Sequence, residues 1–274
     1  KSEGNNRIIL ATDGDFNVGV SSDEAMESLI KEKRESGVFL SVLGFGTGNY
    51  KDSKMETLAD KGNGNYAYID NVLEAKKVLV TEFGGTLFTI AKDVKIQVEF
   101  NPEKVQAYRL IGYENRKLAA EDFNNDKKDA GELGSGHTVT ALYEIIPVGV
   151  KSSFVGSVDA LRYQKVDEEK KLLDHGEELM NIKVRYKSPS GTKSKLIEMP
   201  VMNETIKFAH TSDNFKWSAA VASFGMLLGD SEFKGDLSYG QVAELAKAAR
   251  GADENGYRIE FVKLVESCEL LSES

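Results

Sequence analysis

Two carboxylates follow a short apolar run near the start of the sequence. Arg7 to Ala11 reads RIILA, and Thr12-Asp13-Gly14-Asp15 comes next. An apolar run that ends in a tight turn is typical of a buried parallel strand, so we expect Asp13 at the carboxyl end of a strand. Ligands gather at this edge of open α/β sheets, so Asp13 is a candidate site residue.

An enzyme is the alternative reading of the same residues. Asp13 and Asp15 would then act as paired carboxylates in a Mg²⁺-dependent hydrolase or phosphoryl-transfer enzyme. The sequence offers no phosphate-cradling loop, basic clamp or general base to accompany them. The pattern therefore favours a non-enzymatic binding site.

Two other motifs invite a ligand. Gly44-Phe45-Gly46-Thr47-Gly48-Asn49 resembles a dinucleotide loop, but Asn49 stands where the third glycine belongs. The run EDFNNDKKDAGE offers oxygen ligands for Ca²⁺ from Asp122, Asn124, Asp126 and Asp129. Lys127 and Leu133 occupy the positions of the loop glycine and the final glutamate, so a solvated loop is the simpler interpretation.

Alternating strands and amphipathic helices should position Asp13. Apolar or β-branched runs predict strands over Arg7–Ala11, Val38–Phe45 and Asn65–Ile69. Helix-capping patterns predict helices that start at Ser21-Ser22-Asp23-Glu24, at Ser53-Lys54-Met55-Glu56 and at Asn71-Val72-Leu73-Glu74. This order predicts a parallel sheet with helices on both faces, in an α/β segment over residues 1–85.

The hydrophobic period changes from helical to alternating after residue 85. Half-buried antiparallel strands are predicted at 94–100, 105–112, 138–146 and 179–187, which favours a β-rich, sandwich-like region over 86–211. Residues 166–178 read as an exposed connection. Capping boxes and apolar periodicity then predict a bundle of helices over 212–274.

Composition limits the classes of partner. The chain of 274 residues has 35 Lys+Arg and 44 Asp+Glu, a net charge of −9, which disfavours general binding to nucleic acid. A single cysteine, Cys268, cannot form an internal disulfide. No run approaches 18 apolar residues, and the first ten residues lack the features of an export signal.

Long motifs carry a family resemblance. Ile8-Ile9-Leu10-Ala11-Thr12-Asp13-Gly14, followed by a helix, is similar to the second half of a von Willebrand factor type A domain. Three longer runs resemble bacterial YfbK-like proteins, in which a β-rich and helical region follows such a domain: ILATDGDFNVGVSS (9–22), LGFGTGNYKDSKMETLADKGNGNYAYID (43–70) and FTIAKDVKIQVEFNP (88–102).

The resemblance implies a function and a site. Type A domains hold Mg²⁺ or another divalent cation at a metal-ion-dependent adhesion site, which binds a carboxylate of a protein partner. Of its ligands only the aspartate of the Thr-Asp-Gly turn has a match here, Asp13, and the Asp-x-Ser-x-Ser loop has none. The resemblance thus implies a periplasmic, cell-envelope or secreted binding module, with an incomplete metal site that binds no cation stably by itself.

The first strand should form an edge. Three strands are few for a parallel sheet, and an unpaired apolar edge is usually covered. We therefore expect Arg7–Ala11 to be covered by another chain, with self-association as one form, or by the C-terminal helices.

Overall fold

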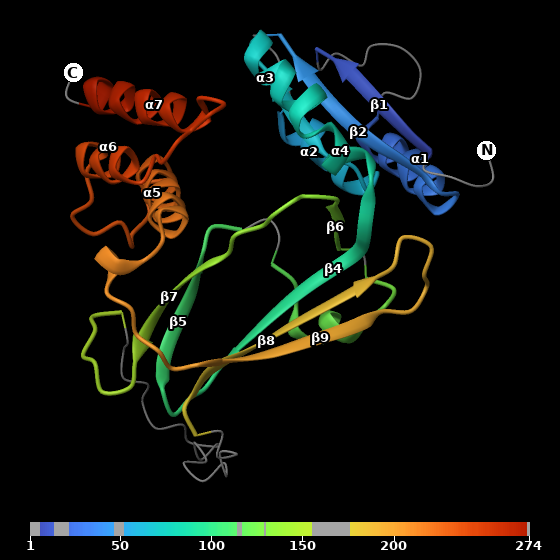
Figure 1. Cartoon of the computed structure of the whole chain (residues 1–274). Coiled ribbons are helices and arrows are strands. Elements are labelled where there is room, and N and C mark those ends of the chain that lie inside the picture. Colours follow the sequence, from blue (N-terminus) through green and yellow to red (C-terminus); the bar gives the residue numbers. More distant parts are fainter. Residues whose placement is uncertain are drawn as a thin grey trace. The chain divides into compact units, whose positions relative to one another are not determined.

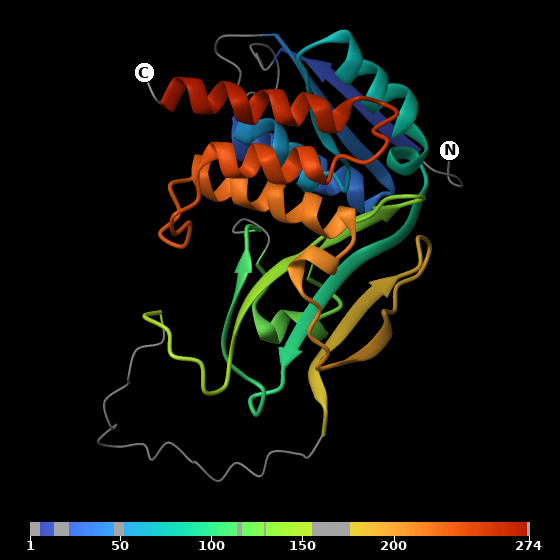
Figure 2. The same cartoon turned by 60° about the vertical axis from the view of Figure 1, so that its left-hand side comes forward.

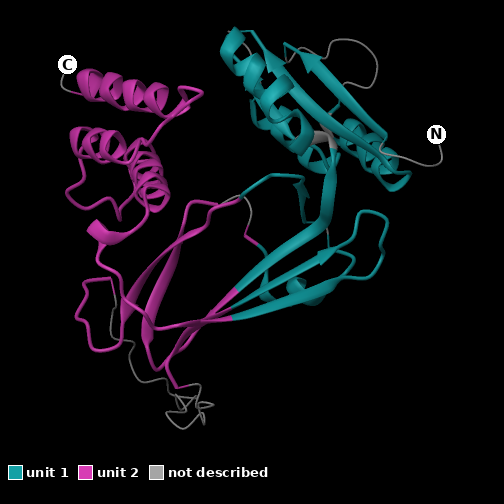
Figure 3. Cartoon of the chain, viewed as in Figure 1, with its two compact units in different colours: residues 1–97, 118–138, 182–199 teal, residues 98–117, 139–181, 200–274 magenta. Residues whose placement is uncertain are grey.

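The computed structural model describes residues 6–13, 22–46, 52–113, 117–128, 130–154 and 176–272. These residues form two compact units, coloured in Figure 3. Unit 1 comprises residues 1–97, 118–138 and 182–199, and unit 2 comprises 98–117, 139–181 and 200–274. Because the chain passes between the units several times, each is described by itself.

A three-stranded parallel sheet is the centre of the N-terminal segment. Its strands β1 (Asn6–Thr12), β2 (Val38–Phe45) and β3 (Tyr66–Ile69) lie in the order β1-β2-β3. Both pairings are parallel, with Thr12 opposite Gly44. Residues 41–44 of β2 are all buried, which requires cover on both faces of the sheet. The predicted parallel α/β arrangement is confirmed.

Two helices pack beside this sheet. Helix α1 (Asp23–Glu35) begins at Ser22, whose side chain accepts a hydrogen bond from the Ala25 amide. It ends before Gly37, whose positive φ of 86° suits a residue without Cβ. Helix α2 (Asp52–Lys61) buries Met55, Leu58 and Ala59 against β2. Both helices therefore follow the predicted apolar spacing, while α1 is capped by Ser22, the second residue of the predicted box, and α2 begins at Asp52, one residue before Ser53.

The third predicted helix is divided and lies largely in solvent. It consists of α3 (Val72–Lys76), the π-helix η1 (Lys77–Thr81) and α4 (Phe83–Leu87), and runs in front of the strands in Figure 1. Asn71 caps it by accepting from two backbone amides. No residue of α3 or η1 is buried. The apolar residues of this segment predicted a helix with a buried face, but the observed helix has no buried residue in α3 or η1.

Strand β1 is the edge of the sheet. Its inner side pairs with β2, and among the described strands none pairs with its outer side. Ile8 and Ile9, which point to opposite faces, are 53% and 41% exposed. The expectation that another chain or the C-terminal helices cover this edge stays a prediction.

Two antiparallel sheets follow, as predicted for the β-rich region. The larger contains β6 (Gly131–Gly134), β4 (Thr89–Phe100), β8 (Glu178–Lys187) and β9 (Lys195–Met202), in that order. The smaller pairs β5 (Val105–Ile111) with β7 (Leu142–Pro147). Strands β6 and β9 were not expected from the sequence.

Around Lys95 and Lys187 the larger sheet buries the face that alternation marks as polar, while Phe100 at the end of β4 is buried on the apolar face. Lys95 of β4 and Lys187 of β8 are 4% and 8% exposed, beneath the segment 118–128. On the opposite face Ile96 is 53% exposed. The salt bridge of Lys183 with Glu198 places Glu198 of β9 on the lysine face, so Ile197 and Met199, exposed by 52% and 54%, lie on the other.

Three helices complete unit 2. Helices α5 (Asp213–Leu228), α6 (Tyr239–Ala248) and α7 (Tyr257–Ser272) lie side by side in Figures 1 and 2, and α6 packs against both of the others. Their shared core contains Ala220, Phe224, Val242, Ala243, Ala246, Val262 and Val265. The short helix η4 (Phe208–His210) precedes α5. The predicted bundle of C-terminal helices is confirmed.

Candidate functional site

Asp13 lies where the sequence places it, one residue beyond β1 at the carboxyl edge of the parallel sheet. Its side chain is exposed. The neighbouring strand brings Gly46 beside it: a Cβ built on Gly46 would lie 3.8 Å from the Asp13 Cβ. Gly46 has a φ of 91°, so the chain turns in the left-handed region as it leaves β2. Asp13 and the end of β2 therefore form one site.

Strand β3 supplies two phenols to the same edge. The Tyr68 hydroxyl donates a hydrogen bond to the Gly46 carbonyl oxygen. The Tyr66 hydroxyl donates to Asp52 Oδ1, in the first turn of α2. At the end of β3, Asp70 Oδ1 accepts from Asn71 Nδ2 at 2.8 Å. This edge thus combines the Asp13 carboxylate, directly after β1, with the turn after β2, whose Gly46 carbonyl accepts a hydrogen bond from Tyr68 of β3.

The described residues do not make a metal site by themselves. No group of three His, Cys, Asp or Glu side chains in the described part of the chain is arranged to hold a metal ion. Asp15 and Asn49 lie outside the described residues. One carboxylate and water bind Mg²⁺ weakly, because Mg²⁺ requires near-octahedral oxygen coordination. The role of Asp13 as a metal ligand stays a prediction.

The acidic run near residue 124 binds cationic side chains of the chain itself. The 3-10 helix η3 (Ala120–Asn124) and the residues after it cover Lys95 and Lys187. Lys95 Nζ donates to the carbonyl oxygens of Asp122 and Asn125, at 3.1 and 2.5 Å. Lys187 Nζ donates to the Asp126 carbonyl at 2.6 Å. The ammonium groups therefore bond to main-chain oxygens of this run. Of the side-chain oxygens in the calcium interpretation, Asn124 Oδ1 accepts from Arg185 and Asp126 Oδ2 from the Ser194 amide, and Asp129 lies outside the described residues.

The charges of this buried cluster are balanced by carboxylates. Lys187 Nζ forms a 2.7 Å ion pair with Asp93 Oδ2. Arg185 donates to Asn124 Oδ1 at 2.8 Å and lies over the Phe123 ring. Burial lowers the pKa of Lys95, as does the charge of Lys187, while the nearby aspartates raise it. The sequence did not predict that these lysines are buried, because they alternate with apolar residues as the solvent-facing residues of a half-buried strand do.

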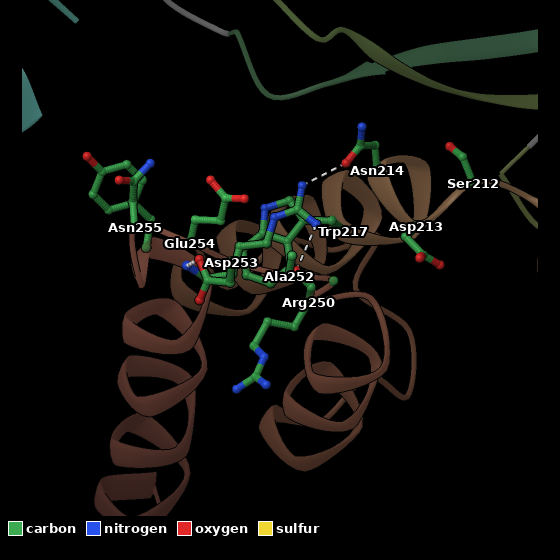
Figure 4. A pocket seen from close by; sticks show the side chains of 12 residues that line it. Ser212, Asp213, Asn214, Trp217, Arg250, Ala252, Asp253, Glu254 and Asn255 are labelled. Carbon is green, nitrogen blue, oxygen red and sulfur yellow. Dashed lines mark hydrogen bonds between the residues drawn. The ribbon is translucent and has the colours of Figure 1, made fainter. Parts of the chain in front are cut away.

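A hollow lies among the C-terminal helices (Figure 4). It has a volume of about 750 Å³ and is lined by the starts of α5 and α7 and by the connection between α6 and α7. Arg258 lies over the Trp217 ring and donates to the carbonyls of Ala249 and Arg250 and to Asn214 Oδ1. Because Trp217 also packs edge-on against Phe261, these side chains join the helices to one another.

Comparison with known protein families identifies the family of this chain. A family model described as "Uncharacterized protein YfbK, C-terminal" matches residues 85–271. The chain belongs to this family. YfbK of Escherichia coli K12 is 47% identical over 263 residues, which cover 96% of this chain and 44% of that relative. The chain therefore spans less than half the length of the E. coli YfbK protein.

One solved structure is also among the matches to this chain. This structure, described as von Willebrand factor type A from Catenulispora acidiphila, is 14% identical in sequence, and the match has a TM-score of 0.37. The match covers 96% of this chain and 58% of the chain in that structure.

None of the helices in the described part of this YfbK-family chain is long and apolar enough to cross a membrane.

Proposed function

We propose that this chain is part of a non-enzymatic protein-binding module of the cell envelope or of a secreted protein. In the complete protein, Asp13 would supply one carboxylate to a divalent cation, Mg²⁺ or another, at the carboxyl edge of the parallel sheet. The cation would offer an open coordination position to a carboxylate of the partner. The observation that carries the proposal is the position of Asp13 one residue after β1, beside the turn at Gly46.

The resemblance to type A domains supports binding rather than hydrolysis. The resemblance of residues 1–85 to type A domains extends over the Thr12-Asp13-Gly14 turn, which in those domains contributes to adhesion. The remaining ligands would come from residues outside the described ranges or from polypeptide that this chain does not span. The described residues therefore contribute one exposed carboxylate beside a hydrogen-bonded turn, and we expect this chain alone to bind Mn²⁺ or Mg²⁺ feebly.

Asp13→Ala in the full-length protein tests the proposal. Partners are captured on immobilised protein with and without EDTA, and then identified by mass spectrometry. We expect capture that is lost both with EDTA and in Asp13→Ala, because each removes the bridge to the partner carboxylate. Asp60→Ala is the matched control, since it removes an exposed carboxylate of α2 away from the sheet edge.

Two results would contradict this function. Capture that persists with EDTA would remove the metal from the interaction. Hydrolysis of a phosphate ester that requires both Mg²⁺ and Asp13 would favour the hydrolase or phosphoryl-transfer alternative instead.

A further inference from the structure

Two tyrosines of the short strand β3 form hydrogen bonds at the two ends of the connection between β2 and α2. Tyr66 and Tyr68 are two residues apart in β3, so their side chains lie on the same face of the sheet. Tyr68 bonds the carbonyl of Gly46, which directly follows β2. Tyr66 bonds the carboxylate of Asp52, which begins α2. One strand thus holds both described ends of this connection.

The hydroxyl groups, and not only the rings, are needed for this arrangement. The Tyr66 ring packs against the core that contains Met55 and Leu58, a contact that phenylalanine would also make. The hydrogen bonds are specific to tyrosine, because the phenolic O–H is a donor at the far end of the ring. Both bonds are made at the exposed rim of the sheet, where packing alone would leave the backbone less restricted.

The fixed turn is also the described neighbour of Asp13. Gly46 adopts a positive φ of 91°, and its Cα is close enough to Asp13 that an added Cβ would contact the Asp13 Cβ at 3.8 Å. Movement of the Gly46 backbone would therefore change the surroundings of the Asp13 carboxylate. A positioned side chain depends on neighbours that are themselves held by hydrogen bonds.

We propose that Tyr66 and Tyr68 are positioning residues of the carboxyl edge. Their hydroxyls hold the end of β2 and the start of α2 in register, and so fix the backbone beside Asp13. The functional part of this inference rests on the binding role proposed for Asp13. The positioning itself is a property of this chain and can be measured without a metal or a partner.

Local hydrogen exchange of the 274-residue chain tests the inference. In Tyr68→Phe, we expect the amides of residues 45 and 46 to exchange about three- to tenfold faster, the effect of losing one net hydrogen bond. In Tyr66→Phe, the amides of residues 55 and 56, the first that can bond within α2, should respond instead. Val42 and Leu43, which are buried in β2, should keep their protection in both variants. Tyr108→Phe, in β5 of the other unit, is the matched control.

The outcomes separate positioning from general stability and from the metal. Unchanged exchange at residues 45–46 and 55–56, or an equal increase at Val42 and Leu43, would overturn the inference. Faster local exchange together with EDTA-insensitive capture would support the positioning while it removes the proposed metal-dependent function.

Discussion

The buried pair Lys187–Asp93 permits a quantitative test of the lysine cluster. Lys187 Nζ lies 2.7 Å from Asp93 Oδ2, and the two side chains are only 10% and 16% exposed. In Lys187→Met the Asp93 carboxylate stays largely buried but loses this ion-pair partner. Removal of one partner from a buried ion pair costs about 3–5 kcal/mol, because the remaining charge stays desolvated.

Two neighbouring contacts adjust this expectation. Lys187 also donates to the Asp126 carbonyl, and that bond is lost in the variant. In contrast, the charge of Lys187 lowers the pKa of Lys95, so the variant relieves a repulsion between two ammonium groups. We therefore expect the lower part of the range, about 3 kcal/mol.

Urea unfolding followed by circular dichroism measures the free energy of unfolding of Lys187→Met, Asp93→Asn and the double variant. Asparagine suits position 93, where φ is 51°. We expect the double variant to cost at least about 1 kcal/mol less than the sum of the single variants, because neither charge is then left unpaired. Lys183→Met is the control: its 3.7 Å pair with Glu198 is more exposed and should contribute less than about 1 kcal/mol. Additive single effects, or a cost for Lys187→Met as small as that of Lys183→Met, would refute the reasoning.

Two further predictions concern helix starts in unit 2. Asp253 accepts from the Arg258 and Ile259 amides at the start of α7; burial alone would raise its pKa, but these hydrogen bonds lower it. The carboxylate therefore stabilises the fold above about pH 4, the unfolded pKa, and this contribution is lost as pH falls through the lower folded pKa. Asp253→Asn should cost about 1 kcal/mol at pH 7 and progressively less toward pH 2 in denaturation assays; a constant difference would exclude the charge effect. Ser238→Ala should likewise cost about 1 kcal/mol by urea unfolding, because Ser238 and Gln241 form a capping box at α6, and an unchanged midpoint would contradict it.

Local signals in the sequence predicted the elements that depend on few neighbours. The continuous apolar run of β2 gave the strand Val38–Phe45 with its observed ends. The capping box at Ser238 located the start of α6. In both cases a short segment contains the physical cause of the structure, whether burial on two faces or a bond between a side chain and a nearby amide.

Other features depend on residues distant in the sequence. Strand β9 contains Pro200, which removes a backbone donor and weakens the strand pattern, and its place is an edge of the sheet. The burial of Lys95 depends on carbonyl groups about 30 residues further along the chain. For the candidate site, the sequence predicted the position of Asp13, but not that Tyr68 would bond the neighbouring turn. A hydrogen bond between strands needs the register, which alternation alone does not define.

The reversed faces of the larger antiparallel sheet determine how its surface can be engineered. A redesign guided by alternation would keep Ile96 as core and replace Lys95 to increase or reduce surface charge. That change would remove the donor that binds the carbonyls of Asp122 and Asn125, and the segment over the sheet would lose its attachment. Polar substitutions belong instead at Ile96, Ile197 and Met199, which are already more than half exposed. For soluble expression and crystallisation, these apolar positions are the ones to change, and the lysines are the ones to preserve.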